Sequence, residues 1–124
     1  MALAIVIREP GPASVLRPES VAVGETGSGE IRIAHRAVGV NFHDIYVRTG
    51  LYRTLPLPGV PGLEAVGVVV QLGRGVEGLE VGDRVAYVCD KYGTYATERV
   101  FPSALFVNGP PPTTGGGLAC SPLA

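Results

Sequence analysis

The segment GVNFHDIYVRTGLY, residues 39–52, concentrates in fourteen positions the side chains best suited to binding a small molecule. It holds an amide, an imidazole, a carboxylate, a guanidinium and two phenols. Such groups suit a polar planar ligand that carries a carbonyl or a phosphate. The segment contains no obvious nucleophile, so its chemistry would belong to a bound cofactor. The competing interpretation is the polar face of a short surface helix whose tyrosines only pack.

The pattern predicts a short helix over residues 42–49 that begins directly after a strand. Asn41 can act as the N-cap, Asp44 lies near the positive helix end, and Gly50 fits the position after the last helical residue. Apolar and aromatic side chains recur at the spacing of one helix face: Phe42, Ile45 and Tyr46. Asp44 and Arg48 are spaced to form an ion pair. A helix of about two turns is not stable alone, so packing must hold it.

Where a strand leads directly into a helix, the polar ends of several side chains would lie around one cleft. These are Asn41, Asp44, Tyr46, Arg48 and Tyr52. We expect His43, at the second helical position, to face water instead.

The rest of the chain is predicted to be mainly β. Extended segments are expected at 3–8, 15–23, 30–40, 64–73, 83–88 and 93–101, with a rigid connection at 55–62. In the strand at 30–40, apolar and polar residues alternate at first, and then both faces become apolar. This pattern suggests that the second half of the strand enters the core. The strand at 64–73 is apolar almost throughout, so we expect both of its faces to be covered.

The composition argues against several classes of protein. The net charge is −1 and the ten basic residues are scattered, so no surface for nucleic acid or an anionic membrane is indicated. No apolar run approaches the roughly eighteen residues of a membrane span. The N-terminal residues MALAIVIREP are typical of a strand and not of a signal peptide. Two cysteines form no disulfide framework, and a cytoplasmic protein is expected.

No metal site and no dinucleotide fold are indicated. The candidate soft ligands are His35, His43, Cys89 and Cys120, without any C-x-x-C or H-x-x-x-H pair. We expect His35 to face solvent or to bond a neighbour. The segments GRGVEG and GLEAVG contain glycines, but each is followed by another strand, so they are interpreted as turns and strand positions.

Residues 108–124, NGPPPTTGGGLACSPLA, differ abruptly from the rest of the chain. They carry no charge and no hydrophobic period. We therefore expect one domain over residues 1–107 followed by an irregular tail.

Three segments carry a resemblance to a known family: AVGVNFHDIYVRTGLY, LPLPGVPGLEAVGVV and GRGVEGLEVGDRVAYV. In this order they resemble the N-terminal half of the medium-chain dehydrogenase/reductase superfamily. The most similar branch is the NADPH:quinone reductases related to zeta-crystallin. The resemblance runs from about residue 3 to 107. It implies a GroES-like, partly open β-barrel that the family follows with a Rossmann domain, which is absent from this chain.

The resemblance also assigns roles. Zinc-dependent members carry a cysteine at the position of Asn41 and a histidine at that of Leu63. Both ligands are replaced, as in the zinc-free branch. There the equivalents of the five polar tips line the cleft where nicotinamide meets its substrate. The implied catalytic residues are Asn41, Tyr46 and Tyr52. The implied cofactor-binding residues are Asn41, Phe42, Asp44, Tyr46 and Arg48.

The implied activity is hydride transfer from NADPH to a quinone or a conjugated carbonyl. Because the phosphate-binding helix lies in the Rossmann domain, we expect this chain alone to be inactive. A frameshift or an added tail would each explain residues 108–124. Two other functions stay open: a non-catalytic GroES-like module that binds a partner or self-associates, and an enoyl-thioester reductase. The choice between NADPH and NADH also stays open, as does a homodimer.

Overall fold

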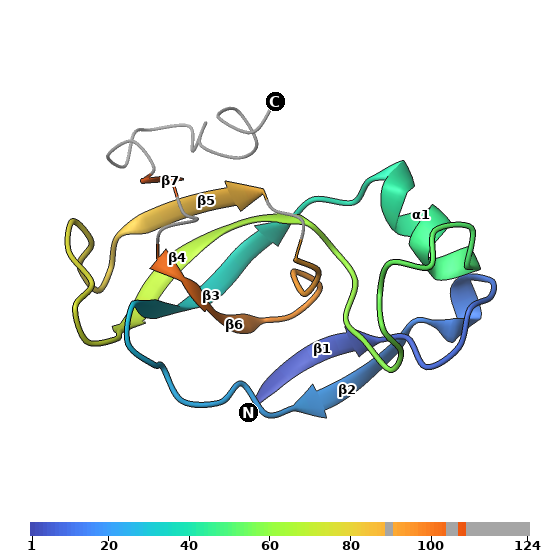
Figure 1. Cartoon of the computed structure of the whole chain (residues 1–124), viewed down its shortest axis with the longest axis horizontal. Coiled ribbons are helices and arrows are strands. Elements are labelled where there is room, and N and C mark those ends of the chain that lie inside the picture. Colours follow the sequence, from blue (N-terminus) through green and yellow to red (C-terminus); the bar gives the residue numbers. More distant parts are fainter. Residues whose placement is uncertain (89–90, 104–106, 109–124) are drawn as a thin grey trace.

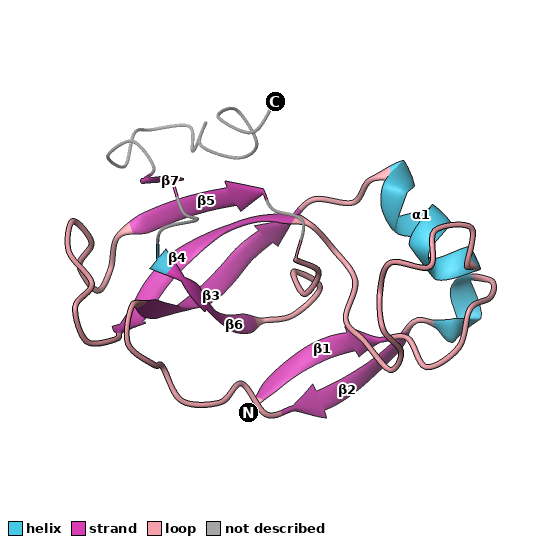
Figure 2. Ribbon diagram, in the orientation of Figure 1, coloured by secondary structure: helices cyan, strands magenta, loops and turns pink. Residues whose placement is uncertain are grey.

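The computed structural model describes residues 1–88, 91–103 and 107–108 (Figure 1). Two antiparallel sheets and one short helix make up this part of the chain (Figure 2). The elements are β1 (Ala2–Val6), the 3-10 turn η1 (Ala13–Val15), β2 (Arg17–Val21), β3 (Glu30–Val38), α1 (Phe42–Thr49), β4 (Glu64–Leu72), β5 (Arg84–Val88), β6 (Glu98–Pro102) and β7 (Val107–Asn108). The predicted fold class, mainly β with a single helix over 42–49, is confirmed.

The larger sheet has the strand order β6-β3-β4-β5-β7, and β1 pairs with β2 in the smaller one. Residues 95–97 join the two sheets. The Ile5 N–H donates to the Tyr95 carbonyl over 2.8 Å, and the Thr97 N–H donates to the Leu3 carbonyl over 2.8 Å. These bonds place β1 beside the segment that leads into β6, and α1 extends from the far end of β3 (Figure 1).

The core lies on one face of the larger sheet. It consists of Ile31, Ile33, Ala65, Val69, Leu79, Val85, Tyr87 and Phe101. Alternation along β3 turns Ile31 and Ile33 inward, where both are fully buried. Each large apolar side chain contributes about 1.5–3 kcal/mol of stability when it leaves water completely. This packing fixes β3, the strand that leads into α1.

Two predictions about strand burial are wrong. The register of β3 shifts between His35 and Ala37, and the residues beyond the shift, Arg36, Ala37 and Val38, are exposed. An irregular register redirects side chains, so the second half of β3 does not enter the core. In β4 one face is buried, whereas the other is only half-buried and Val70 on it is exposed, so the strand is not fully covered on both faces.

The expected strand at 93–101 begins later, at Glu98. Gly93 has a left-handed φ of 142°, and its N–H donates to the Gly62 carbonyl over 3.1 Å. The Tyr95 N–H donates to the Pro61 carbonyl over 3.0 Å. Gly93 and Tyr95 therefore bond to the connection before β4, and bonding to β3 begins only where the Thr97 carbonyl accepts the His35 N–H over 2.9 Å.

The predicted tail falls mostly outside the described residues, as do Cys89 and Cys120. Asn108, which we assigned to the tail, belongs to β7 and pairs with Val85 of β5. The predicted domain boundary at residue 107 stays a prediction.

His35, a residue of β3, is part of a hydrogen-bond network with Ala96, Tyr87 and Arg99. Its Nδ1 lies 2.7 Å from the Ala96 carbonyl oxygen, and its Nε2 lies 2.9 Å from the Tyr87 hydroxyl. Because a carbonyl only accepts, Nδ1 carries the proton and Nε2 accepts from Tyr87. Arg99 Nη1 donates to the same hydroxyl over 3.3 Å. The expectation that His35 bonds a neighbour is confirmed. Burial, reinforced by the nearby charge of Arg99, lowers the pKa of His35.

The lowered pKa of His35 predicts that acid destabilises the folded protein. Below the ordinary value of 6.5, the unfolded chain takes up a proton that the folded protein resists. The free energy of unfolding should therefore fall as the pH drops from about 7.5 to about 5.5. Urea denaturation at a series of pH values measures this slope. His35→Gln, whose amide can still donate and accept, should flatten it, and an unchanged slope in that variant would contradict the assignment.

Candidate functional site

Helix α1 begins and ends where the sequence predicts. Asn41 is the N-cap with extended backbone angles, and its N–H donates to Oδ2 of Asp44 over 2.9 Å. Gly50 ends the helix in the left-handed region at φ 86°. A carboxylate at this position satisfies one of the free N–H groups of the first turn and favours the helix dipole.

The inner face of α1 is anchored by Asp44, which is only 5% exposed. The Tyr95 hydroxyl donates to Asp44 Oδ2 over 2.9 Å. Burial, together with the hydrogen bond to Asp44 and its charge, raises the pKa of Tyr95, so the phenol remains a donor. Val47 is buried on the same side of the helix.

Arg48 does not pair with Asp44, and that prediction is wrong. Among the described residues the ion pairs are Arg8–Glu19 and Arg32–Glu98. Arg48 Nε donates instead to the Gly11 carbonyl over 3.2 Å, and the Gly11 N–H donates to the Arg48 carbonyl over 2.9 Å. Both charged side chains of α1 find partners in other segments, which fixes the orientation of the helix.

The exposed aromatic residues lie on the outer face of α1 and in the segment directly after it. The rings of Tyr46 and Tyr52 lie edge to face, with centroids 5.3 Å apart and planes at 70°. Both remain partly exposed, at 37% and 43%. Asn41 and Phe42 are also exposed at the start of the helix. Edge-to-face pairs are a favoured aromatic geometry, so the two phenols keep a defined relative position.

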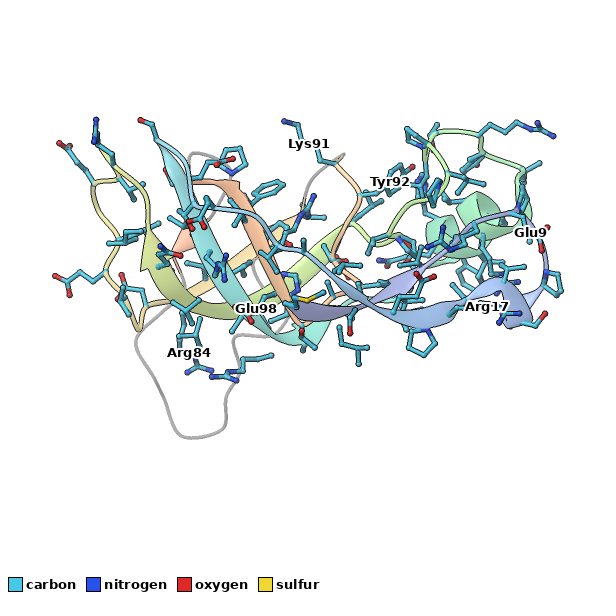
Figure 3. All side chains as sticks on the ribbon, turned by 90° about the horizontal axis from the view of Figure 1, so that it is seen from below. Glu9, Arg17, Arg84, Lys91, Tyr92 and Glu98 are labelled. Atoms are coloured by element: carbon cyan, nitrogen blue, oxygen red, sulfur yellow. The ribbon has the colours of Figure 1, made fainter. Side chains whose placement is uncertain are left out.

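His43 does not face water as we expected. Its ring is half-buried, with its centroid 5.3 Å from Tyr52 and 5.9 Å from Tyr92. Its Nε2 lies 2.8 Å from the Tyr92 hydroxyl, which lies 2.6 Å from Thr54 Oγ1. Figure 3 shows Tyr92 beside the helix region. Tyr92 comes from a distant segment, so periodicity around residues 42–49 contains no signal for this contact.

The structure therefore divides the predicted site residues into two groups. Tyr46 and Tyr52 are in contact, and Asn41 and Phe42 are accessible beside them. Asp44 and Arg48 turn toward the rest of the fold and orient the helix. Their predicted contacts with a cofactor, like those of the first group, stay predictions.

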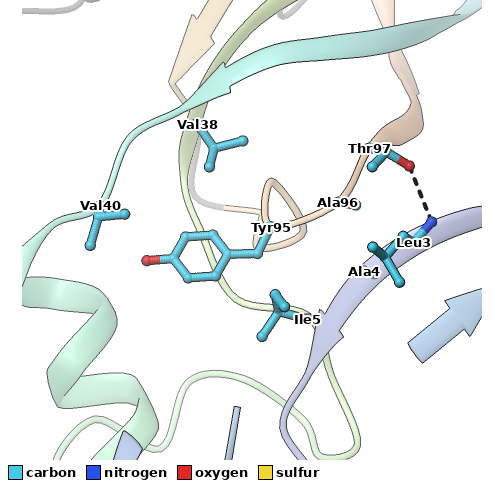
Figure 4. Close-up of a pocket in the computed structure, with 8 residues that line it drawn as sticks. All are labelled: Leu3, Ala4, Ile5, Val38, Val40, Tyr95, Ala96 and Thr97. Atoms are coloured by element: carbon cyan, nitrogen blue, oxygen red, sulfur yellow. Dashed lines mark hydrogen bonds between the residues drawn. The ribbon is translucent and has the colours of Figure 1, made fainter. Parts of the chain in front are cut away.

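An apolar groove of about 330 Å³ lies near the start of α1 (Figure 4). Its lining residues are Leu3, Ala4, Ile5, Val38, Val40, Tyr95, Ala96 and Thr97. A second hollow of about 220 Å³ includes Asp44 and Arg48 in its wall. The first groove suits an apolar group, whereas the tyrosine pair offers hydrogen-bond donors.

The described part of the chain holds neither a cluster of metal-ligating side chains nor a helix long enough to span a membrane. Within residues 1–88, 91–103 and 107–108, no three His, Cys, Asp or Glu side chains gather as metal ligands would. The only α-helix described there is α1, whose eight residues are too few to cross a membrane.

Comparison with known proteins gives the family. The alcohol dehydrogenase GroES-like domain matches residues 27–119. This chain belongs to that family. A quinone oxidoreductase from Salmonella typhimurium is 40% identical over 97 residues, which cover 78% of this chain and 30% of the relative. A 2-haloacrylate reductase from a Burkholderia species is 37% identical over 113 residues, covering 89% of this chain and 34% of the relative.

A solved structure supports the same relationship. The Escherichia coli quinone oxidoreductase complexed with NADPH superposes with a TM-score of 0.82 at 31% identity, covering 87% of this chain and 33% of that one. The predicted relation of this GroES-like domain to the quinone oxidoreductases is confirmed. The chain spans about a third of the length of these relatives.

The buried carboxylate of this GroES-like domain provides a stability test. Asp44→Ala leaves the Asn41 N–H and the Tyr95 hydroxyl without their acceptor and should cost about 3 kcal/mol. Asp83 is a matched control, because its carboxylate accepts the Glu80 N–H over 2.9 Å in an exposed turn. Asp83→Ala should cost about 0.5–1 kcal/mol. Urea denaturation compares the two variants, and equal losses would refute the anchoring role of Asp44.

Proposed function

We propose that this GroES-like domain is the catalytic-domain part of a zinc-independent, NADPH-dependent quinone or enone oxidoreductase of the cytoplasm. The observation that carries the proposal is the edge-to-face pair of Tyr46, on α1, and Tyr52, just after it, both partly exposed. The named activities of two relatives, quinone oxidation-reduction and 2-haloacrylate reduction, fit substrates with a quinone or a conjugated carbonyl. The NADPH bound to the Escherichia coli enzyme supports the choice of cofactor.

The exposed groups on α1 and directly beside its two ends fit a nicotinamide ring and a flat substrate. Two phenol rings offer apolar faces for packing, and their hydroxyls can donate hydrogen bonds. Asn41, exposed at the N-cap, offers an amide that both donates and accepts. When bound, the nicotinamide would supply the hydride.

The chain's own residues would stabilise charge and position the reactants. Reduction of a carbonyl places negative charge on its oxygen, and a preorganised O–H donor lowers the energy of that charge. We assign this role to Tyr52 and Tyr46, with Asn41 as a further hydrogen-bonding group. Phe42, which is 76% exposed, would provide an apolar wall beside them. Asp44 and Arg48 would act by holding the helix that carries these groups.

Zinc does not fit the positions that hold it in related enzymes. Leu63 has no donor atom, and the amide of Asn41 is a poor ligand compared with a thiolate. We therefore expect protein purified without added metal to contain far less than one zinc per chain. Elemental analysis of the folded protein measures this, and stoichiometric zinc would contradict the zinc-independent assignment.

The activity is tested by supplying the second domain. Residues 1–108, which include all of β7, are joined to the dinucleotide-binding domain of the Salmonella typhimurium quinone oxidoreductase. NADPH oxidation is followed with a quinone, a conjugated ketone and an enoyl thioester. Turnover with the quinone or the ketone is expected. The unfused chain should be silent, because the phosphate-binding helix belongs to the other domain.

Within that chimera, Tyr52→Phe should lower kcat about 100-fold, since it removes one donor to the developing charge. Thr26→Val is the control, because its hydroxyl bonds Gln71 far from α1 and its loss should leave turnover unchanged. Full activity of Tyr52→Phe would refute the catalytic assignment. A preference for the enoyl thioester would favour that substrate class over quinones.

A further inference from the structure

A hydrogen-bond chain runs from Thr54 through Tyr92 to His43. It joins three segments: the connection after α1, the segment before β6, and α1 itself. The Tyr92 hydroxyl lies 2.6 Å from Thr54 Oγ1 and 2.8 Å from His43 Nε2. A phenol has one proton to donate and can accept another, so both contacts can be hydrogen bonds at once.

The His43 end of this chain reaches the tyrosine pair. The His43 ring is stacked on Tyr92, with planes 22° apart, and is tilted by 49° against Tyr52. Tyr52 in turn lies edge to face with Tyr46. The four rings therefore form a continuous row in which His43 separates the proposed catalytic pair from Tyr92.

At the Tyr92 end of the row, Arg99 links the backbone to the core residue Phe101. Arg99 Nη2 donates to the carbonyls of Lys91 and Tyr92 over 2.9 and 2.8 Å. The guanidinium lies over Phe101, with Cζ 4.4 Å from the ring centroid. Gly93 has a φ of 142°, a conformation that favours glycine, and a Cβ there would also lie 2.9 Å from Arg99 Cζ.

We propose that Tyr92 and His43 are positioning residues that hold Tyr52 against Tyr46. The role of that pair rests on the proposed function, whereas the positioning itself is a property of the free protein. A catalytic donor must be held accurately, because a displacement of about 1 Å can cost about 100-fold in rate. The path from Arg99 to Tyr52 provides this support from outside α1.

The first experiment examines the 124-residue chain without ligand. Tyrosine rings are labelled with ¹³C, and their signals are assigned by NMR. Tyr92→Phe keeps the ring but removes the hydroxyl that bonds His43 and Thr54. We expect the ring signals of Tyr52 and Tyr46 to shift and broaden, while those of Tyr87 in the core stay in place. Thr26→Val, which removes a hydroxyl that bonds Gln71, should leave all of them unchanged.

His43→Phe provides an independent variant, because it keeps a ring against Tyr52 and leaves the Arg99 bonds to Lys91 and Tyr92 intact. It should move the same two ring signals even if Tyr92→Phe does not fold. Unchanged Tyr46 and Tyr52 signals in either folded variant would overturn the positioning role.

The second experiment separates positioning from function. Duroquinone is titrated into the same labelled chain, because the methyl groups on its ring prevent addition of cysteine thiols. In the unmodified chain the Tyr46 and Tyr52 signals should move, and Tyr92→Phe should weaken binding about tenfold. An unchanged affinity in Tyr92→Phe overturns the functional role of Tyr92. Unmoved signals in the unmodified chain count against the proposed function, and the positioning role is then decided by the ligand-free spectra.

Discussion

The buried carboxylate of Asp44 is the contact on which the arrangement of α1 depends. It accepts the N–H of the N-cap residue Asn41 and the hydroxyl of Tyr95, so one side chain both starts the helix and ties it to the segment before β6. A helix of eight residues has too few internal bonds to persist alone. Its position relative to the sheets is therefore set by this carboxylate, by the two bonds between Arg48 and Gly11, and by burial of Val47.

The segment from Lys91 to Thr97 connects the site with the rest of the fold. Its backbone bonds to β1 and to the connection before β4, and the carbonyls of Lys91 and Tyr92 accept from Arg99. From this one segment, Tyr95 reaches the inner face of α1 and Tyr92 reaches His43. Two residues that follow β5 thus hold the helix, Tyr95 through Asp44 and Tyr92 through His43.

The separation of buried charged groups from exposed phenols suits a domain that supplies one wall of a cleft shared with another domain. The charged groups of α1 bond within the fold, whereas the phenols of Tyr46 and Tyr52 and the amide of the N-cap residue Asn41 remain accessible. The accessible groups are donors and aromatic faces, which are able to position a ligand and stabilise charge without forming covalent bonds. The proposed oxidoreductase function needs these properties from the domain, and the hydride itself would come from a cofactor.

Local pattern determined much of this from the sequence alone. The helix over 42–49, its N-cap Asn41 and its terminal Gly50 were predictable because caps and i, i+4 spacing act between near neighbours. The ordered motifs likewise indicated the family. Tertiary structure decided which way the side chains of α1 point. Arg48 bonds Gly11 and not Asp44, and His43 packs against Tyr92 and not against water. The register shift in β3 was hidden for the same reason. Each of these outcomes depends on residues distant in sequence, whose meeting is set by strand pairing and not by any pattern around the residue itself.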